Sequence, residues 1–187
     1  MKKSTIFIII GLVLVLIVGY FVSTYNGLVK KEEEVTSKFS DISVQLERRA
    51  DLIPNLVKTV KGYINHEKAA IDSVTSSREK LLNAKGVEDK AEANQQLSKS
   101  LNNLLMIVEN YPDLKADKSF VQLQDELAGT ENRIAISRKE YNASVKEYNK
   151  TLKTFPRNMI ANMFGFDSKE YFEANESAKE VPNVSFE

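Results

Sequence analysis

The sequence predicts an all-α protein in which an N-terminal transmembrane helix is followed by four amphipathic helices. The chain of 187 residues contains only seven glycines and four prolines, so residues that interrupt helices are scarce. One apolar run near the N-terminus is long enough to cross a bilayer. In the rest of the chain, apolar residues recur at intervals of three and four, which is the period of an amphipathic helix.

The anchor is predicted from the run STIFIIIGLVLVLIVGYFV, which lies between Lys3 and Ser23. The run holds about 18 mainly apolar residues without a charge, close to the ~20 that cross a bilayer as a helix. No small-x-small cleavage site follows it, so we expect residues 1–24 to be retained rather than removed as a signal peptide. Lys2 and Lys3 favour a cytoplasmic N-terminus, which places the soluble domain on the outer face of the membrane.

The overall composition argues against several classes of function. The chain has 26 basic and 26 acidic residues, so no net field attracts nucleic acid or an acidic substrate. The absence of cysteine from the sequence excludes disulfides, thiolate nucleophiles and cysteine-based metal sites. We therefore expect neither nucleic-acid binding nor thiol chemistry.

The first helical pattern places a charge at an apolar position. Between Leu46 and Ile53 the period falls on Arg49, so either a cation is buried or the helix ends there. Pro54 would cost ~3 kcal/mol inside a helix but is tolerated in a first turn, and Asp51 stands at an N-cap position before it. We expect a corner near Arg49, with one long kinked helix as the alternative.

Three further helices are expected. The second covers about residues 52–82 and ends before Gly86, which offers a left-handed cap. The third reaches Val108 and stops before Pro112. The fourth, over residues 120–152, has the most regular pattern and is about 35 residues long, or ~50 Å.

A short repeat lies inside the fourth helix, where KEYNASV is followed directly by KEYNKTL. One copy is one heptad, so Tyr141 and Tyr148 fall on the same face, as in a coiled coil. We expect both rings to fill a seam between helices; an aromatic ladder that binds a ligand is the alternative.

The segment after Pro156, RNMIANMFGFDSKEYFEA, is rich in methionine and phenylalanine. A corner near Arg49 would return it to the membrane end, whereas one long first helix would send it to the far tip. Phe164 and Phe166 would then either cap the open end of the helices or enter the membrane interface. The predicted organisation is an anchor over 1–24, a helical domain over 25–175 and a flexible tail over 176–187.

Several ordered blocks of the sequence resemble the LemA family of bacterial membrane-anchored proteins. The blocks are YNGLV, RRADLIPNLVKTVKGYINHE, ENYPDLKADKSFVQLQDELAGTENRIAISRKEYNASVKEYN and FPRNMIANMFGF. The resemblance covers nearly the whole chain after Gly19. It implies an antiparallel up-and-down four-helix bundle behind the anchor, and it supplies no catalytic residue and no cofactor.

Four antiparallel helices would bring two polar clusters into the domain. The ends of the first and third helices and the starts of the second and fourth would meet, which makes Glu109 a candidate partner for Arg49. We expect ion pairs that fix helix register; a site for a partner's peptide or a lipid headgroup is the alternative. The structural or partner-binding candidates are Arg48, Arg49, Asp51, Pro54 and Glu109 in one cluster and Glu131, Arg133 and Arg138 in the other.

The sequence lacks the parts of a catalytic site. Its single histidine, His66, belongs to no Glu-x-x-His pair, and no Gly-rich phosphate loop is present. We expect no catalytic, metal-binding or cofactor-binding residue and no small-molecule substrate. The predicted function is a non-enzymatic, membrane-anchored scaffold or adaptor of the cell envelope that binds a protein partner. The alternative is a self-associating structural protein that organises membrane as a homo-oligomer.

Overall fold

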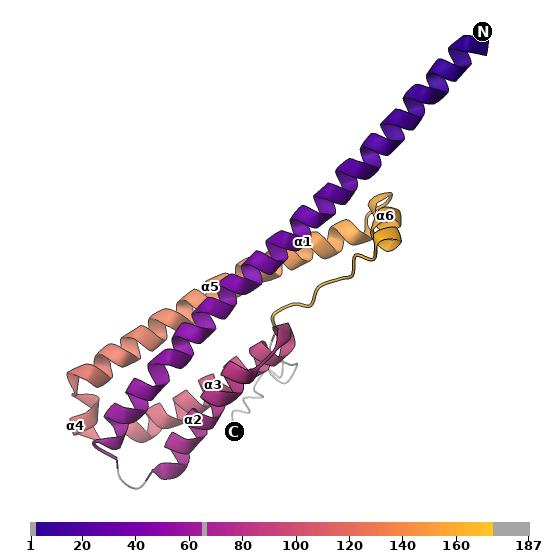
Figure 1. The fold of residues 1–187 in the computed structure, drawn as a ribbon. Coiled ribbons are helices and arrows are strands. Elements are labelled where there is room, and N and C mark those ends of the chain that lie inside the picture. Colours follow the sequence, from indigo (N-terminus) through magenta and orange to yellow (C-terminus); the bar gives the residue numbers. More distant parts are fainter. Residues whose placement is uncertain (1–2, 65–66, 174–187) are drawn as a thin grey trace, which may run out of the picture. The chain divides into compact units, whose positions relative to one another are not determined.

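The computed structural model describes residues 3–64 and 67–173, and these residues form helices and connecting loops without any strand. The predicted all-helical class is therefore confirmed, while His66 and the predicted tail over 176–187 lie outside the described residues. The helices in chain order (Figure 1) are α1 (Lys3–Lys61), α2 (Lys68–Asn83), α3 (Gly86–Val108), α4 (Pro112–Lys115), α5 (Lys118–Lys153) and α6 (Arg157–Phe164).

The chain divides into two compact units that share α1 and α5. The first, which we call the anchor unit, comprises the described residues up to 38 together with 142–169. The second, the core unit, comprises residues 39–141 and the described residues from 170 to 173. The predicted boundary after residue 24 falls inside α1, which crosses it without interruption.

The N-terminal part of α1 is apolar and exposed. Its large side chains from Phe7 to Val22 are uncovered by the rest of the protein. In the described part of the chain, α1 is the one helix long and apolar enough to cross a membrane. A bilayer would cover this exposed surface, as the predicted anchor requires.

The predicted corner near Arg49 is wrong, because α1 continues through Pro54 and ends at Lys61. Proline has no N–H, so the carbonyl of Ala50, four residues earlier, loses its partner within the helix. Nε of Arg78, on α2, donates a hydrogen bond to this buried carbonyl at 2.8 Å. The Arg78 side chain thus replaces the backbone N–H donor that proline lacks, which explains how α1 continues through Pro54.

The actual break follows α1 and divides the predicted second helix. The backbone N–H groups of Gly62 and Tyr63 bond to carbonyls of the last turn at 3.1 and 3.0 Å, and α2 then begins at Lys68. Gly86 has the predicted left-handed conformation, with φ +80°, but it is the first residue of α3.

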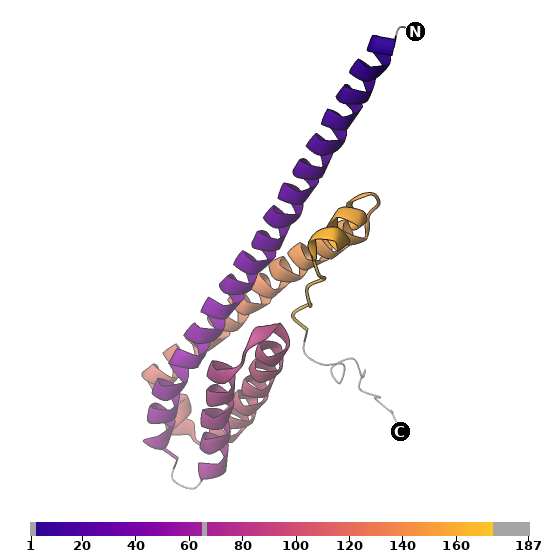
Figure 2. The same ribbon diagram turned by 45° about the vertical axis from the view of Figure 1, so that its right-hand side comes forward.

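The helices α2 and α3 form a hairpin and lie side by side in both views (Figures 1 and 2). A hydroxyl cluster joins them: Ser100 Oγ on α3 lies 3.0 Å from Ser73 Oγ and 2.8 Å from Ser77 Oγ on α2. Small side chains at this contact allow the two helices to approach closely.

The predicted long fourth helix is confirmed as α5, which has 36 residues. Asp117 caps its first turn by accepting hydrogen bonds from the N–H groups of Ser119 and Phe120 at 2.9 and 3.0 Å. The Tyr63 hydroxyl also donates to Asp117, at 2.9 Å. The bond from Phe120, followed by that from Tyr63, lowers the pKa of the Asp117 carboxyl below its usual range. The loop after α1 is thereby tied to the start of α5.

Three contacts in the core unit connect the α1 side of the core to the α5 side. They join Phe39 to Tyr141, Arg49 to Glu131, and Tyr63 to Asp117. From the first of these pairs to the third, the residue number of the first partner increases, from 39 to 63, and that of the second decreases, from 141 to 117. Buried apolar residues of all four long helices fill the core, among them Ile42, Leu56, Val74, Leu104 and Ile134.

Candidate functional site

A buried cation is the most unusual polar feature of the core unit. Arg49 on α1 is 5% exposed. Its Nη1 donates to Asn94 Oδ1 on α3 at 2.6 Å and lies 2.6 Å from Glu131 Oε2 on α5. Burial lowers the pKa of the Arg49 guanidinium, and the negative charge of Glu131 opposes this shift. One side chain therefore connects three helices.

The predicted partner of Arg49 is wrong. Glu109 instead forms an ion pair with Lys115, 2.5 Å away, and both side chains are exposed. Glu131, which we placed in a separate polar layer, is the carboxylate that reaches Arg49. The other polar candidates Arg48, Asp51, Arg133 and Arg138 are exposed, and Asp51 lies inside α1 rather than at its start.

A cavity of about 240 Å³ adjoins the buried cation. Its walls are mainly apolar and come from α1, α3 and α5, with Leu56, Leu101 and Leu127 among the lining residues. Arg49 Nε is buried and lacks a hydrogen-bond partner within the described structure. Asn102, Gln124 and Glu131 also line the cavity, which therefore combines apolar walls with polar groups beside the buried arginine.

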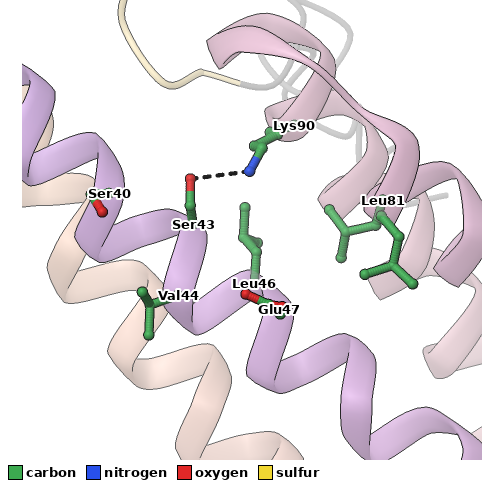
Figure 3. A pocket seen from close by; sticks show the side chains of 8 residues that line it. Ser40, Ser43, Val44, Leu46, Glu47, Leu81 and Lys90 are labelled. Carbon is green, nitrogen blue, oxygen red and sulfur yellow. Dashed lines mark hydrogen bonds between the residues drawn. The ribbon is translucent and has the colours of Figure 1, made fainter.

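A second concavity, of about 370 Å³, lies between α1 and the α2–α3 hairpin. Figure 3 shows Lys90 pointing toward Ser43, to whose Oγ it donates a hydrogen bond at 3.1 Å. Lys90 Nζ also lies 5.7 Å from the centre of the Phe39 ring, a cation–π geometry. Exposed Val44 lines the same groove with Glu47, so the surface combines apolar and charged groups. We call it the α1–hairpin groove.

The two tyrosines of the heptad repeat are both buried, as predicted. Tyr141, in the core unit, donates from its hydroxyl to the Glu170 carbonyl at 2.8 Å. Tyr148, in the anchor unit, has a buried hydroxyl without a partner in the described structure, and Lys169 Nζ lies 6.0 Å from its ring centre. Burial, reinforced by nearby carboxylates, raises the pKa of each phenol to about 12.

The two hydroxyls should respond differently to replacement. Tyr141→Phe is expected to lower the free energy of unfolding by about 1 kcal/mol at neutral pH, since it removes a hydrogen bond. Tyr148→Phe should leave it unchanged or raise it, because no bond is lost. Chemical denaturation of each full-length variant in detergent measures the difference, and equal losses in both variants would contradict it.

The same variants test the raised pKa values. Above about pH 10 the unfolded chain loses the phenolic protons, whereas the folded protein keeps them until about pH 12. The contribution of these phenols to the free energy of unfolding is therefore at its full value below about pH 10, and it decreases as the pH rises to about 12. Tyr148→Phe should flatten this alkaline loss relative to the wild type.

The segment after α5 lies against α1 in the anchor unit. The Tyr25 ring contacts the rings of Phe164 and Phe166 edge-on, with centres 4.9 and 5.7 Å apart. Lys169 forms an ion pair with Glu32 at 2.6 Å, and Asn149 exchanges two hydrogen bonds with the Lys169 backbone. The segment therefore lies beside the end of the apolar run. A long first helix was expected to send it to the far tip instead. That expectation is wrong because the chain turns after Lys61, so that α1, α2, α3 and α5 still make four long helices.

The described residues contain no group of three or more His, Asp or Glu side chains arranged to hold a metal ion. The polar sites are thus a paired arginine, a capped helix start and aromatic contacts. Their chemistry is that of hydrogen bonding and packing.

Comparison with known proteins places this architecture in a family. The model of the LemA family matches residues 38–186 of the chain. The chain belongs to the LemA family. Since the described residues include a candidate membrane-spanning helix, this LemA-family chain is a membrane-associated helical protein.

Two kinds of relative accompany the family match. Magnetosome protein MamQ of Magnetospirillum gryphiswaldense is 27% identical over 174 residues, covering 79% of this chain and 64% of that protein. Protein LemA of Metamycoplasma hominis is 27% identical over 167 residues, covering 87% of this chain and 76% of that protein. The LemA-family chain thus spans just under two thirds of the length of MamQ.

Sequence reasoning missed two residues and one contact of this LemA-family structure. Arg78 could have been sought once Pro54 was placed inside a helix, because an unpaired carbonyl at position 50 then requires a donor. Asn94 carries no such signal, because an amide is common on helices. Tyr25 follows the apolar run, where an interfacial aromatic residue is expected, but its contact with Phe164 and Phe166 is shown only by the fold.

Proposed function

We propose that this LemA-family protein is a non-enzymatic, membrane-anchored scaffold of the bacterial cell envelope that holds a partner protein near the membrane. One observation carries the proposal: the apolar anchor and the α1 wall of the core unit are a single uninterrupted helix. A surface presented on such a helix stays attached to the bilayer.

The arrangement of the core supports a helical bundle whose located polar groups have structural roles. In the core unit, residue numbers increase along α1 and decrease along α5 through their three contacts, and α2 and α3 form a hairpin. Both features support an antiparallel four-helix bundle in the core unit of the predicted domain. The polar groups that we located stabilise helix ends and helix register. They do not form a nucleophile and base pair.

The α1–hairpin groove is the surface that we assign to the partner. Exposed Val44 and Leu82 offer apolar contact, while Lys90 and Glu47 lie beside them with opposite charges. An amphipathic helix from another envelope protein, with an apolar stripe and charged edges, fits this combination.

The absence of cysteine from the sequence allows a direct test of this assignment. Val44→Cys places one thiol at the groove, and Ile136→Cys is a matched control because the two residues are 56% and 59% exposed. Each full-length variant carries a maleimide-linked photo-crosslinker in native membranes, and mass spectrometry identifies the products. We expect one heterologous protein to be linked at higher yield from position 44 than from position 136.

The outcomes separate the two classes of function. Links between copies of this chain at near-stoichiometric yield would favour a self-associating structural protein. Equal, low yields from both positions would contradict partner binding at the groove. The same cysteines report orientation: labelling by a membrane-impermeant maleimide in intact cells is expected if the domain lies on the outer face, and protection would reverse that orientation.

A further inference from the structure

The end of the anchor unit carries an apolar surface and a local excess of positive charge. Phe155, Met159, Met163 and Phe164 are exposed on α6 and the turn before it. Residues 150–166 contain Lys150, Lys153 and Arg157 but no acidic residue. Apolar side chains next to basic ones are typical of segments that lie in the membrane interface.

A small cavity lies where α6 meets the end of the apolar run. Its volume is about 180 Å³, and its lining includes Arg157 from α6 and Lys31 from α1. The other polar groups are hydroxyls of Tyr20, Ser23, Thr24 and Thr151, and no acidic residue lines it. The Thr151 hydroxyl already donates to the Glu147 carbonyl at 2.7 Å. The two cations and the hydroxyls of Tyr20, Ser23 and Thr24 are suited to an oxyanion.

The position of this cavity along α1 identifies the source of the anion. Tyr20 and Ser23 lie at the end of the apolar run, which is the depth at which lipid headgroups begin. The contacts of Tyr25 with Phe164 and Phe166 hold α6 at this level of the helix. A phosphate bound at this depth is expected to come from a phospholipid, because only a lipid also has acyl chains that would cover the neighbouring apolar side chains.

We propose that this cavity binds the phosphate of an anionic phospholipid and that the apolar side chains of α6 enter the adjacent leaflet. Arg157 and Lys31 contact the headgroup, and Met159 and Met163 contact the upper part of the acyl chains. The anchor and α6 then form one lipid-binding surface. This inference does not depend on whether the core unit binds a protein partner.

Insertion of α6 is tested with a single tryptophan, since the sequence contains none. Met163→Trp reports on α6, and Met106→Trp on α3 is the matched control because the two methionines are 66% and 65% exposed. Each full-length variant is reconstituted in phosphatidylcholine bilayers containing phosphatidylglycerol. We expect blue-shifted emission and quenching by brominated lipid for Met163→Trp, and neither for Met106→Trp. Water-like or unquenched emission at position 163 would overturn insertion.

Headgroup recognition is tested by comparing brominated phosphatidylglycerol with brominated phosphatidylcholine at the same mole fraction. Stronger quenching by the anionic lipid is expected, and Arg157→Ala should reduce this preference about fivefold. Arg133→Ala, which removes the same charge from an exposed position on α5, should leave it unchanged. Equal quenching by both lipids, or an equal effect of the two substitutions, would overturn the headgroup site. Displacement of the lipid by millimolar inorganic phosphate would show a site for free anions instead, which also contradicts the proposal.

Discussion

Arg49→Ala is expected to lower the free energy of unfolding by about 2–3 kcal/mol. Removing one member of a fully buried ion pair costs roughly 3–5 kcal/mol. The loss here is smaller because Glu131 is 50% exposed in its side chain and water can solvate it. Asn94 loses the donor to its buried oxygen, and a cavity replaces the aliphatic part of the arginine. Urea denaturation of the full-length protein in detergent measures the change.

A double-mutant cycle identifies the partner of Arg49. Arg49→Ala combined with Glu131→Gln should cost less than the sum of the two single changes, because the groups are in contact. Arg49→Ala combined with Glu109→Gln should be additive within about 0.5 kcal/mol, since Glu109 pairs with Lys115. Coupling to Glu109 but not to Glu131 would contradict the structure.

Arg78→Ala is expected to be the second strongly destabilising substitution, by roughly 1–3 kcal/mol, because it leaves the buried Ala50 carbonyl without a donor. Pro54→Ala should act in the opposite direction. It restores a backbone N–H to that carbonyl and removes part of the ~3 kcal/mol that proline costs inside a helix.

The decisive measurement combines these two substitutions. In the Pro54→Ala background, Arg78→Ala should cost much less than in the wild type, since the Ala50 carbonyl has regained its partner within the helix. Unfolding free energies of the four proteins give the coupling between positions 54 and 78. An unchanged cost of Arg78→Ala in both backgrounds would show that the side chain stabilises the protein through packing alone.

The local structure of this chain could largely be predicted from its sequence. Helix periodicity and the apolar run identified the helical class, the candidate membrane-spanning helix and the length of α5, because these depend on residues close together in the chain. The corner near Arg49 failed for a non-local reason. The proline rule is sound for an isolated helix, but Arg78, on another helix, supplies the missing donor.

Two of the three members of the candidate site, Arg49 and Glu131, were predictable, but their pairing was not. The period through Leu46 and Ile53 correctly indicated that Arg49 could be buried, and Glu131 was recognised beside the apolar positions of α5. Which carboxylate meets the guanidinium depends on where α1 ends, and the misplaced corner directed Arg49 to Glu109. Asn94 lies in a stretch without a recognisable pattern, so its role required the three-dimensional structure.

The contact of Tyr25 with Phe164 and Phe166 has a consequence for membranes of different thickness. The apolar run between Lys3 and Ser23, about 18 residues, is ~27 Å long as a helix, slightly shorter than the ~30 Å hydrocarbon layer of an average bilayer. Such hydrophobic mismatch is relieved when the bilayer thins locally or draws flanking residues inward. Because the Tyr25 ring is packed against Phe164 of α6 and against Phe166, two residues beyond the end of α6, Tyr25 cannot move inward without this segment. Bilayer thickness therefore acts on α6 as well as on the N-terminal part of α1.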